Sequence, residues 1–189
     1  MKNLTILIIT LLAAFAMDVQ AQEFKLDNKK SEINWTGKAA FNSYSLTGTL
    51  TSEAGNIIIK DNQIESLEVI IDMKSLNHEN KRLKSHLRGK DFFEVKKYSQ
   101  ATFTLDKPTA VQDGHAELSG TLKIKNSAHS ENIQAIVKIE DNKVLLTFNT
   151  EIDRTKYGVK FNSPTFFKKM KENAIADSFK LAGGFVFVK

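Results

Sequence analysis

The sequence predicts an all-β protein, an antiparallel barrel or sandwich of eight or more strands. Apolar and polar residues alternate with period two from Phe24 onward, so each strand has one apolar and one polar face. Asp, Asn and Gly tolerate the left-handed backbone of tight hairpins, and they separate the alternating runs at 61–62, 113–114 and 141–142. The 189 residues include no cysteine, so no disulfide can stabilise the fold. A closed barrel suits such a chain because it leaves no unpaired strand edge to aggregate.

The N-terminus has the features of a secretory signal peptide. Lys2 supplies a positive charge, residues 4–16 form a short apolar run, and Val19-Gln20-Ala21 is a small-residue cleavage site. We therefore expect cleavage after Ala21, a mature domain of residues 22–189, and a periplasmic or secreted location. The apolar run is too short to span a bilayer comfortably and no second one follows, so we expect no retained transmembrane anchor.

The net charge of +5 is moderately basic. Contact with an anionic membrane surface or an acidic headgroup would fit this charge. Solvated lysines on strand exteriors explain it as well, and we favour them because the lysines are spread along the chain. The sequence lacks the clustered basic and aromatic motif that would indicate nucleic-acid binding. The oligomeric state is left open, a dimer included.

The strands expected from this alternation lie at 32–37, 46–51, 57–59, 67–71, 101–105, 118–124, 133–151 (a hairpin) and 179–189. Most of them are joined by short turns, as antiparallel strands are.

One stretch, residues 86–103, interrupts the alternation. It combines a cationic turn, a pair of phenylalanines at 92–93 and a second basic cluster. A short helix is expected to lead into this stretch. It would be capped by Ser75 or Asn77 and ended by Gly89 in the left-handed conformation. Its apolar residues recur at helical spacing: Leu76, Leu83 and Leu87. Because so short a helix is marginal alone, we expect it to lie on the barrel or across its mouth as a lid, fixed by the two phenylalanines.

A second short helix is expected from Ser163, with Pro164 at its first position. Its apolar residues are Phe166, Phe167 and Met170. The segment 166–171 (FFKKMK) alternates apolar bulk with cations, which suits shallow docking on an anionic membrane. A solvated helix with one buried face is the commoner explanation of the same pattern.

Three glycines lie on apolar strand faces: Gly37, Gly48 and Gly120. An eight-stranded barrel is wide enough to be filled by side chains or to hold one small ligand, and missing side chains would leave such a volume. Bulges or bends that let the sheet close would require the same glycines. The sequence leaves these two interpretations equally open.

An aromatic, apolar lining is typical of small-molecule pockets. The candidate lining comprises Trp35, Leu46, Gly48, Leu50, Phe92, Phe93, Phe103, Gly120, Leu122, Phe148 and Phe185, and Phe179 and Phe187 are further aromatic candidates. For any single aromatic residue ordinary core packing is the safer interpretation, because apolar strand faces are buried with or without a ligand.

The sequence offers little for catalysis. It has neither a cysteine nucleophile nor a Gly-x-Ser-x-Gly turn. Its four histidines, His78, His86, His115 and His129, have no spacing that supports tetrahedral metal ligation. We therefore expect no enzyme, no metal and no cofactor.

Three basic residues are candidates for the barrel mouth. His86 beside Arg88 could hold an anionic headgroup, although a solvated loop histidine is the simpler interpretation. Arg154 follows a long strand and could clamp a phosphate with its forked guanidinium. We favour a structural role for Arg154, with Asp91 as its expected partner.

Three blocks occur in order behind the signal peptide: HLRGKDFFEVKKYSQATF, LSGTLKIKN and IDRTKYGV. Together they resemble the YceI-like polyisoprenoid-binding proteins of bacteria, over essentially the whole mature chain. The resemblance implies a lipocalin-like antiparallel β-barrel of about eight strands, with one or two short helices, that holds an isoprenoid chain in an apolar tunnel without catalysis.

The matching positions are Phe92 and Phe93 as the paired aromatics, Gly120 as the mid-strand glycine, and the step 153–154 as the Asp-Arg pair. The sequence departs from the family at Ser99, where proline is frequent, and at Asn126, where glycine is frequent.

The leading hypothesis is an exported, non-catalytic carrier of a polyisoprenoid or a similar long-chain amphiphile such as an isoprenoid quinone. Its partner would be that lipid, with transient membrane contact. The alternative is a structural or stress-related interaction protein whose barrel is filled by its own side chains. An enzyme acting on lipids is a third hypothesis, which would need a polar cluster at the mouth.

Overall fold

The computed structural model describes residues 20–168 and 173–189. Most of the expected signal peptide, residues 1–19, therefore lies outside the described residues, as does Met170. The strands are β1 (Gln22–Leu26), β2 (Glu32–Ala39), β3 (Ser45–Lys60), β4 (Gln63–Asn77), β5 (Gln100–Leu105), β6 (Thr109–Ala110), β7 (His115–Ile124), β8 (Ser127–Glu140), β9 (Lys143–Asp153) and β10 (Ile175–Val188), and the helix is α1 (Lys81–Leu87).

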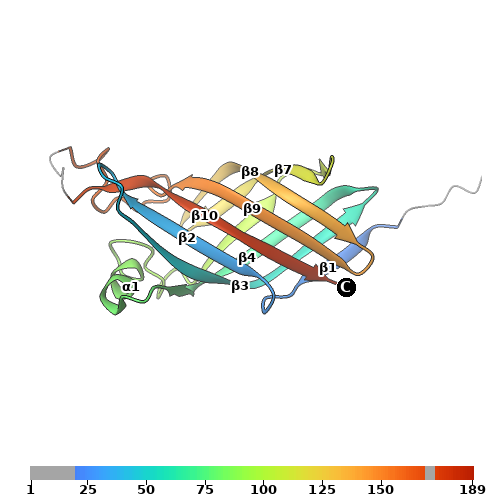
Figure 1. The fold of residues 1–189 in the computed structure, drawn as a ribbon, viewed down its shortest axis with the longest axis horizontal. Coiled ribbons are helices and arrows are strands. Elements are labelled where there is room, and N and C mark those ends of the chain that lie inside the picture. The colour runs from blue at the N-terminus through green and yellow to red at the C-terminus, as the bar shows by residue number, and fades with distance from the viewer. Residues whose placement is uncertain (1–19, 169–172) are drawn as a thin grey trace, which may run out of the picture.

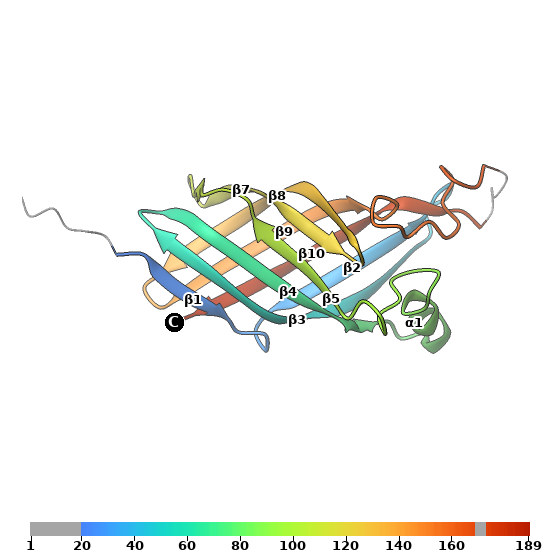
Figure 2. The same ribbon diagram turned by 180° about the vertical axis from the view of Figure 1, so that it is seen from behind.

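Eight antiparallel strands close into a barrel (Figure 1 and Figure 2). They run in the order β3-β2-β10-β9-β8-β7-β5-β4, and β4 pairs with β3 to complete the ring. The short β1 bridges β3 and β10 at one end, and β6 pairs with β4. The structure thus confirms the barrel and excludes the sandwich.

The hairpin turns follow the predicted chemistry. Asp61 and Asn62 have φ of 49° and 58°, and Asp113 and Gly114 have φ of 49° and 76°. These left-handed conformations match the twist of antiparallel strands, which is why Asp, Asn and Gly occur there. The turn at 61–62 joins the long strands β3 and β4, and the turn at 113–114 leads into β7.

The barrel is packed with its own side chains at the end that carries β1. Five apolar residues from five strands are fully buried there: Phe24, Ile57, Ile64, Val144 and Phe187. Figure 1 shows the C-terminus at this end and α1 at the opposite end. One half of the barrel is therefore closed by ordinary core packing, and any binding site must lie toward α1.

The helix is present, but its ends differ from the sequence prediction. Strand β4 continues through Asn77, so neither Ser75 nor Asn77 caps α1. Asn80 is the N-cap, and its side chain accepts hydrogen bonds from the backbone N–H groups of Arg82 and Leu83. The expected left-handed Gly89 is also wrong, because the described glycines with positive φ are Gly114 and Gly158.

The described part of the expected second helix forms turns. The carbonyl oxygen of Ser163 accepts hydrogen bonds from the N–H groups of Phe166 and Phe167, and no helix continues from them through residue 168. Asn162, with φ of 50°, instead ties this loop to the start of β10 through a hydrogen bond to Asn173. Within residues 20–168 and 173–189, no helix has the length and apolar character needed to cross a membrane.

Candidate ligand-binding cavity

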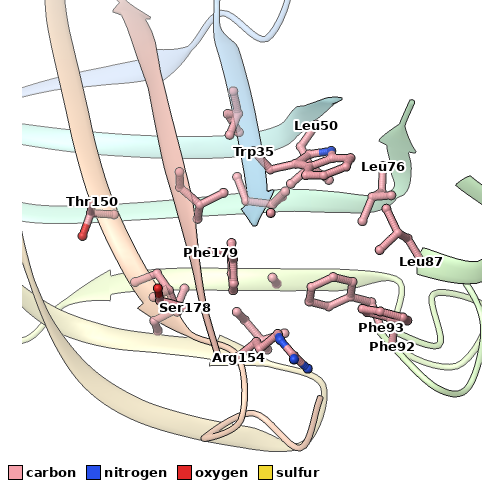
Figure 3. A pocket seen from close by; sticks show the side chains of 18 of the residues that line it. Trp35, Leu50, Leu76, Leu87, Phe92, Phe93, Thr150, Arg154, Ser178 and Phe179 are labelled. Carbon is pink, nitrogen blue, oxygen red and sulfur yellow. The ribbon is translucent and has the colours of Figure 1, made fainter. Parts of the chain in front are cut away.

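A cavity of about 410 Å³ occupies the α1 half of the barrel. This volume lies within the range of small-molecule pockets. Its lining is almost entirely apolar and comes from the barrel strands and from the segment around α1 (Figure 3). The polar residues that touch it are few: Lys38, Thr150, Arg154, Asn173 and Ser178.

Most of the apolar residues predicted from the sequence line this cavity. They are Trp35, Leu46, Leu50, Phe92, Phe93, Phe103, Leu122, Phe148 and Phe185, with Phe179 as a further member. The rings of Phe148 and Phe185 stack with centroids 5.2 Å apart. Phe187 does not line the cavity, because it is fully buried in the packed half.

Gly48 and Gly120 do not line the cavity, and each is covered by an aromatic ring. A Cβ atom at Gly48 would collide with the Trp35 ring and with the backbone oxygen of Asn77, and one at Gly120 would collide with Phe103. The Trp35 indole also donates a hydrogen bond to the Asn77 oxygen at 3.3 Å. These glycines therefore leave no open volume of their own; they let a ring lie flat against the wall.

Gly37 is the glycine of the three that does open into the cavity. The nearest atom to a Cβ there would be Cζ3 of Trp35 at 3.9 Å. Its partners on the neighbouring strands are Leu46 and Phe179, and both line the cavity. Gly37 is thus a notch in the apolar wall.

The segment around α1 acts as the lid that the sequence predicted. Leu83 and Leu87 of α1, with Phe92 and Phe93 after it, line the cavity. Figure 3 shows Leu87, Phe92 and Phe93 on the α1 side of the cavity. The Phe93 ring lies edge-on to Phe179 of β10, with centroids 6.2 Å apart. The lid is therefore attached to the barrel by contacts of its own apolar residues.

The three basic residues expected at the mouth, His86, Arg88 and Arg154, do not form one cluster. His86 lies 3.4 Å from the carboxylate of Asp91, and its ring packs edge-on against Phe92 and Phe161. The Nε atom of Arg88 donates a hydrogen bond to the backbone oxygen of Leu76 at 2.8 Å. Neither His86 nor Arg88 lines the cavity, so the structure does not bring them together with Arg154.

Arg154 lines the cavity, but its guanidinium is used by the fold. It is 3% exposed and donates to three backbone oxygens, from Nε to Ala176, from Nη1 to Val159 and from Nη2 to Ile175, at 2.7–2.9 Å. Burial lowers the pKa of Arg154, against the opposing effect of nearby carboxylates. The favoured structural role agrees with this geometry.

The expected partner of Arg154 was wrong. The nearest carboxylate is that of Asp177, 3.8 Å from Nη2, whereas Asp91 pairs with His86. Partial burial would raise the pKa of Asp177, but polar contacts from Ser163 and Thr165 and the charge of Arg154 hold it below its usual value. Asp177 therefore remains an anion that helps to fix the loop after β9.

Three residues of the lining were not predicted from the sequence: the polar Lys38 and Asn173 and the aromatic Tyr44. Tyr44 lies two residues before Leu46, so the period-two pattern would have placed it on the same face. Lys38 and Asn173 carry no comparable signal, because they belong to strand ends and loops. Among the described residues, no three His, Cys, Asp or Glu side chains gather closely enough to hold a metal ion.

Residues 24–187 match the family model of the YceI-like domain. Curated relatives include UPF0312 proteins of Vibrio parahaemolyticus (25% identical over 125 residues) and Vibrio vulnificus (25% identical over 119 residues). The alignments cover 65% and 61% of this chain and 66% and 63% of those proteins. The chain thus spans just under two thirds of the length of these relatives.

Similar solved structures include BcnA of Burkholderia cenocepacia, with a TM-score of 0.69 and 19% identity over 85% of this chain and 98% of that one. A polyisoprenoid binding domain from Saccharophagus degradans, implicated in plant cell wall breakdown, has a TM-score of 0.66 and 16% identity over 87% and 97% of the two chains. A YceI protein of Campylobacter jejuni has a TM-score of 0.54 and 19% identity over 96% and 85%. At these identities the likeness concerns the fold.

Proposed function

Because the chain belongs to the YceI-like family, we propose that it is an exported, non-catalytic carrier that holds a long-chain isoprenoid lipid in the cavity of its barrel. A polyisoprenoid or an isoprenoid quinone is the proposed cargo. The periplasm or the extracellular space is the proposed location, on the basis of the signal-peptide pattern of residues 1–21.

The observation that carries this proposal is an unfilled apolar cavity of about 410 Å³ next to a half-barrel that is filled by its own side chains. Protein interiors are normally close-packed, and an empty apolar void forfeits dispersion contacts. A hydrocarbon chain restores them and leaves water at the same time. Each buried methylene contributes about 0.8 kcal/mol, so one five-carbon isoprene unit contributes about 4 kcal/mol before the costs of binding.

The apolar lining also favours a carrier over an enzyme. The charged residues that touch the cavity are Arg154 and Lys38. Arg154 is committed to three backbone oxygens, and the ammonium group of Lys38 lies 4.0 Å from the carboxylate of Glu151. General acid–base chemistry needs a titratable group within hydrogen-bond reach of the reacting atom. The named polyisoprenoid-binding neighbour from Saccharophagus degradans supports the choice of cargo.

The filled-barrel alternative describes only the half of the molecule around Phe24 and Phe187. A purely structural protein would gain stability from filling the other half as well, since packed side chains add dispersion contacts. The two hypotheses therefore differ in one measurable property, the uptake of hydrocarbon.

Trp35 provides the assay, because it is the single tryptophan of the chain and it lines the cavity. The protein is stripped of lipid with organic solvent, refolded, and titrated with a polyprenol or an isoprenoid quinone while the Trp35 emission is recorded. We expect a saturable change in emission, and native mass spectrometry of protein from its host should show an added lipid mass. An unchanged emission together with no added mass would contradict the carrier hypothesis.

A straight-chain alcohol of equal carbon number is the control for cargo class. Weaker binding of the straight chain supports an isoprenoid cargo. Equal binding would keep the carrier but refute the isoprenoid preference.

A further inference from the structure

Exposed aromatic side chains gather at the cavity mouth. Five large hydrophobic residues are exposed in the described part of the chain, and four of them form what we call the aromatic rim: Phe41, Tyr44, Phe166 and Phe167, which are 66%, 62%, 47% and 48% exposed. The fifth, Ile136, lies on the barrel wall in β8. The loops that carry the rim extend beyond the barrel at the α1 end in both views (Figure 1 and Figure 2).

The two loops of the rim are joined to each other through the start of β10. The N–H of Ala40 donates to the oxygen of Ala174 at 2.9 Å, and the side chain of Asn162 donates to the oxygen of Asn173 at 3.0 Å. These hydrogen bonds hold the loop before β3 beside the loop after β9. The rim is therefore one surface built from segments far apart in the sequence.

The rim is continuous with the cavity. Tyr44 belongs to both, since it lines the cavity and is 62% exposed. An apolar chain that leaves the cavity past Tyr44 thus meets exposed aromatic rings before it meets bulk water. An exposed apolar patch at the mouth of an apolar cavity marks a site of interaction.

The surroundings of the rim are cationic. The ammonium group of Lys160 lies 4.3 Å from the centre of the Phe166 ring, and residues 154–168 contain no Asp or Glu. The lid segment, residues 79–98, contains seven Lys and Arg against three Asp and Glu, a net charge of +4. Residues 154–168 carry four cations, Arg154, Lys156, Lys160 and Lys168, so both segments at this end of the molecule are strongly positive.

We propose that the aromatic rim docks the cavity mouth on an anionic lipid bilayer. Aromatic rings prefer the interface between headgroups and acyl chains, and lysines near the surface are attracted to anionic lipids. A second copy of this chain fits less well, because an isologous contact would set the lysines of one rim against those of the other. Docking in this way lets an apolar ligand pass between bilayer and cavity without crossing water.

Co-sedimentation with vesicles tests the apolar part of this proposal. The double variant Phe166→Ser/Phe167→Ser should bind vesicles that contain phosphatidylglycerol at least about tenfold more weakly than the unmodified protein. Ile136→Ser removes an exposed apolar side chain from the barrel wall and is the matched control, with unchanged vesicle binding. Equal loss in both variants, or no loss in either, overturns the proposal.

Charge is tested with vesicles of pure phosphatidylcholine and with added salt, and both conditions should weaken binding. Lys160→Glu/Lys168→Glu should reproduce this loss, whereas Lys123→Glu on the outer face of β7 should cause less than half of its effect on the logarithm of the affinity. If vesicle binding changes neither with lipid charge, nor with added salt, nor in the Lys160→Glu/Lys168→Glu variant, the electrostatic part of the docking proposal is wrong.

Two further measurements separate this proposal from its rivals. If the rim instead joins two copies, analytical ultracentrifugation shows a dimer that Phe166→Ser/Phe167→Ser dissociates, and membrane docking is refuted. The Trp35 titration with a polyprenol should be unchanged in the rim variants. Because docking and cargo binding are read by different assays, failure of one leaves the other standing.

Discussion

The notch at Gly37 gives a direct test of whether the cavity is the binding site. In Gly37→Leu the new side chain points between Leu46 and Phe179 into the cavity, where the nearest existing atom is 3.9 Å from the Cβ position. Its four carbons should displace about four carbons of ligand. At about 0.8 kcal/mol per methylene the loss is about 3 kcal/mol, or roughly a hundredfold in the dissociation constant.

The same substitution should not weaken the fold. Glycine inside a strand costs about 0.5–1 kcal/mol relative to alanine, and a leucine there also buries apolar surface. We therefore expect the free energy of unfolding in urea to stay equal or to rise while affinity falls. A blocked cavity lowers the affinity without lowering the free energy of unfolding, whereas a misfolded barrel lowers both.

Gly184→Leu is the matched control. It adds the same side chain in β10, on the outer face next to the cavity-lining Phe185, and its Cβ would lie 3.9 Å from the nearest atom. We expect unchanged affinity by Trp35 emission. If Gly37→Leu is folded and binds a polyprenol as tightly as Gly184→Leu does, the ligand does not occupy this cavity.

Gly48 and Gly120 would be poor sites for this test. Leucine at either position collides with backbone oxygen atoms, of Asn77 and of Thr104 respectively. Loss of binding in such variants would report a distorted sheet as readily as a filled cavity.

Two further predictions concern the structural role of Arg154 and the packed half of the barrel. Arg154→Met should lower the free energy of unfolding by about 3 kcal/mol, because three backbone oxygens lose their donor. Arg88→Met, which removes one hydrogen bond, should cost about 1 kcal/mol, and equal costs in urea unfolding would contradict the structural role of Arg154. Phe24→Ala in the packed half should cost about 3–5 kcal/mol yet leave the polyprenol affinity of the folded protein unchanged. A large loss of affinity in Phe24→Ala would mean that the packed half also takes part in binding.

Much of the fold could be predicted from the sequence because its signals are local. Alternation with period two identifies the strands, and Asp61-Asn62 specifies a tight turn through its own backbone preferences. The start of α1 could not be predicted in the same way. Asn77 has the side chain of a good cap, but it pairs with Thr49 of β3 and so remains part of a strand. That pairing is a tertiary contact, and no local signal reveals it.

The partner of Arg154 was beyond local reasoning for a similar reason. The sequence indicates that a buried arginine needs acceptors, and Asp91 was the acceptor expected from the lid. The structure uses backbone oxygens of Val159, Ile175 and Ala176 instead. These backbone oxygens lie near Arg154 only because the barrel brings the segments together. Every residue has such an oxygen, so the residue types do not reveal which of them Arg154 contacts.

The cavity shows what alternation cannot specify. Period two tells which side chains point inward, but it does not tell how far along the barrel axis each one lies. Phe185 and Phe187 are two residues apart on the inner face of β10, yet Phe185 lines the cavity and Phe187 is fully buried beyond it. β1 pairs with the end of β10 at Phe187, and its own Phe24 is also fully buried.

The boundary between the packed and hollow halves therefore depends on a few large residues rather than on the strand pattern. The stacked pair Phe148 and Phe185 lies at this boundary, with Val144 and Phe187 of the same two strands already in the packed half. Side chains of other sizes at 148 and 185 would deepen or shorten the cavity without altering strand pairing, because the hydrogen bonds of the sheet are made by the backbone. In a carrier of the proposed kind, packing at the floor of the cavity would then set the length of the apolar chain that the barrel accepts.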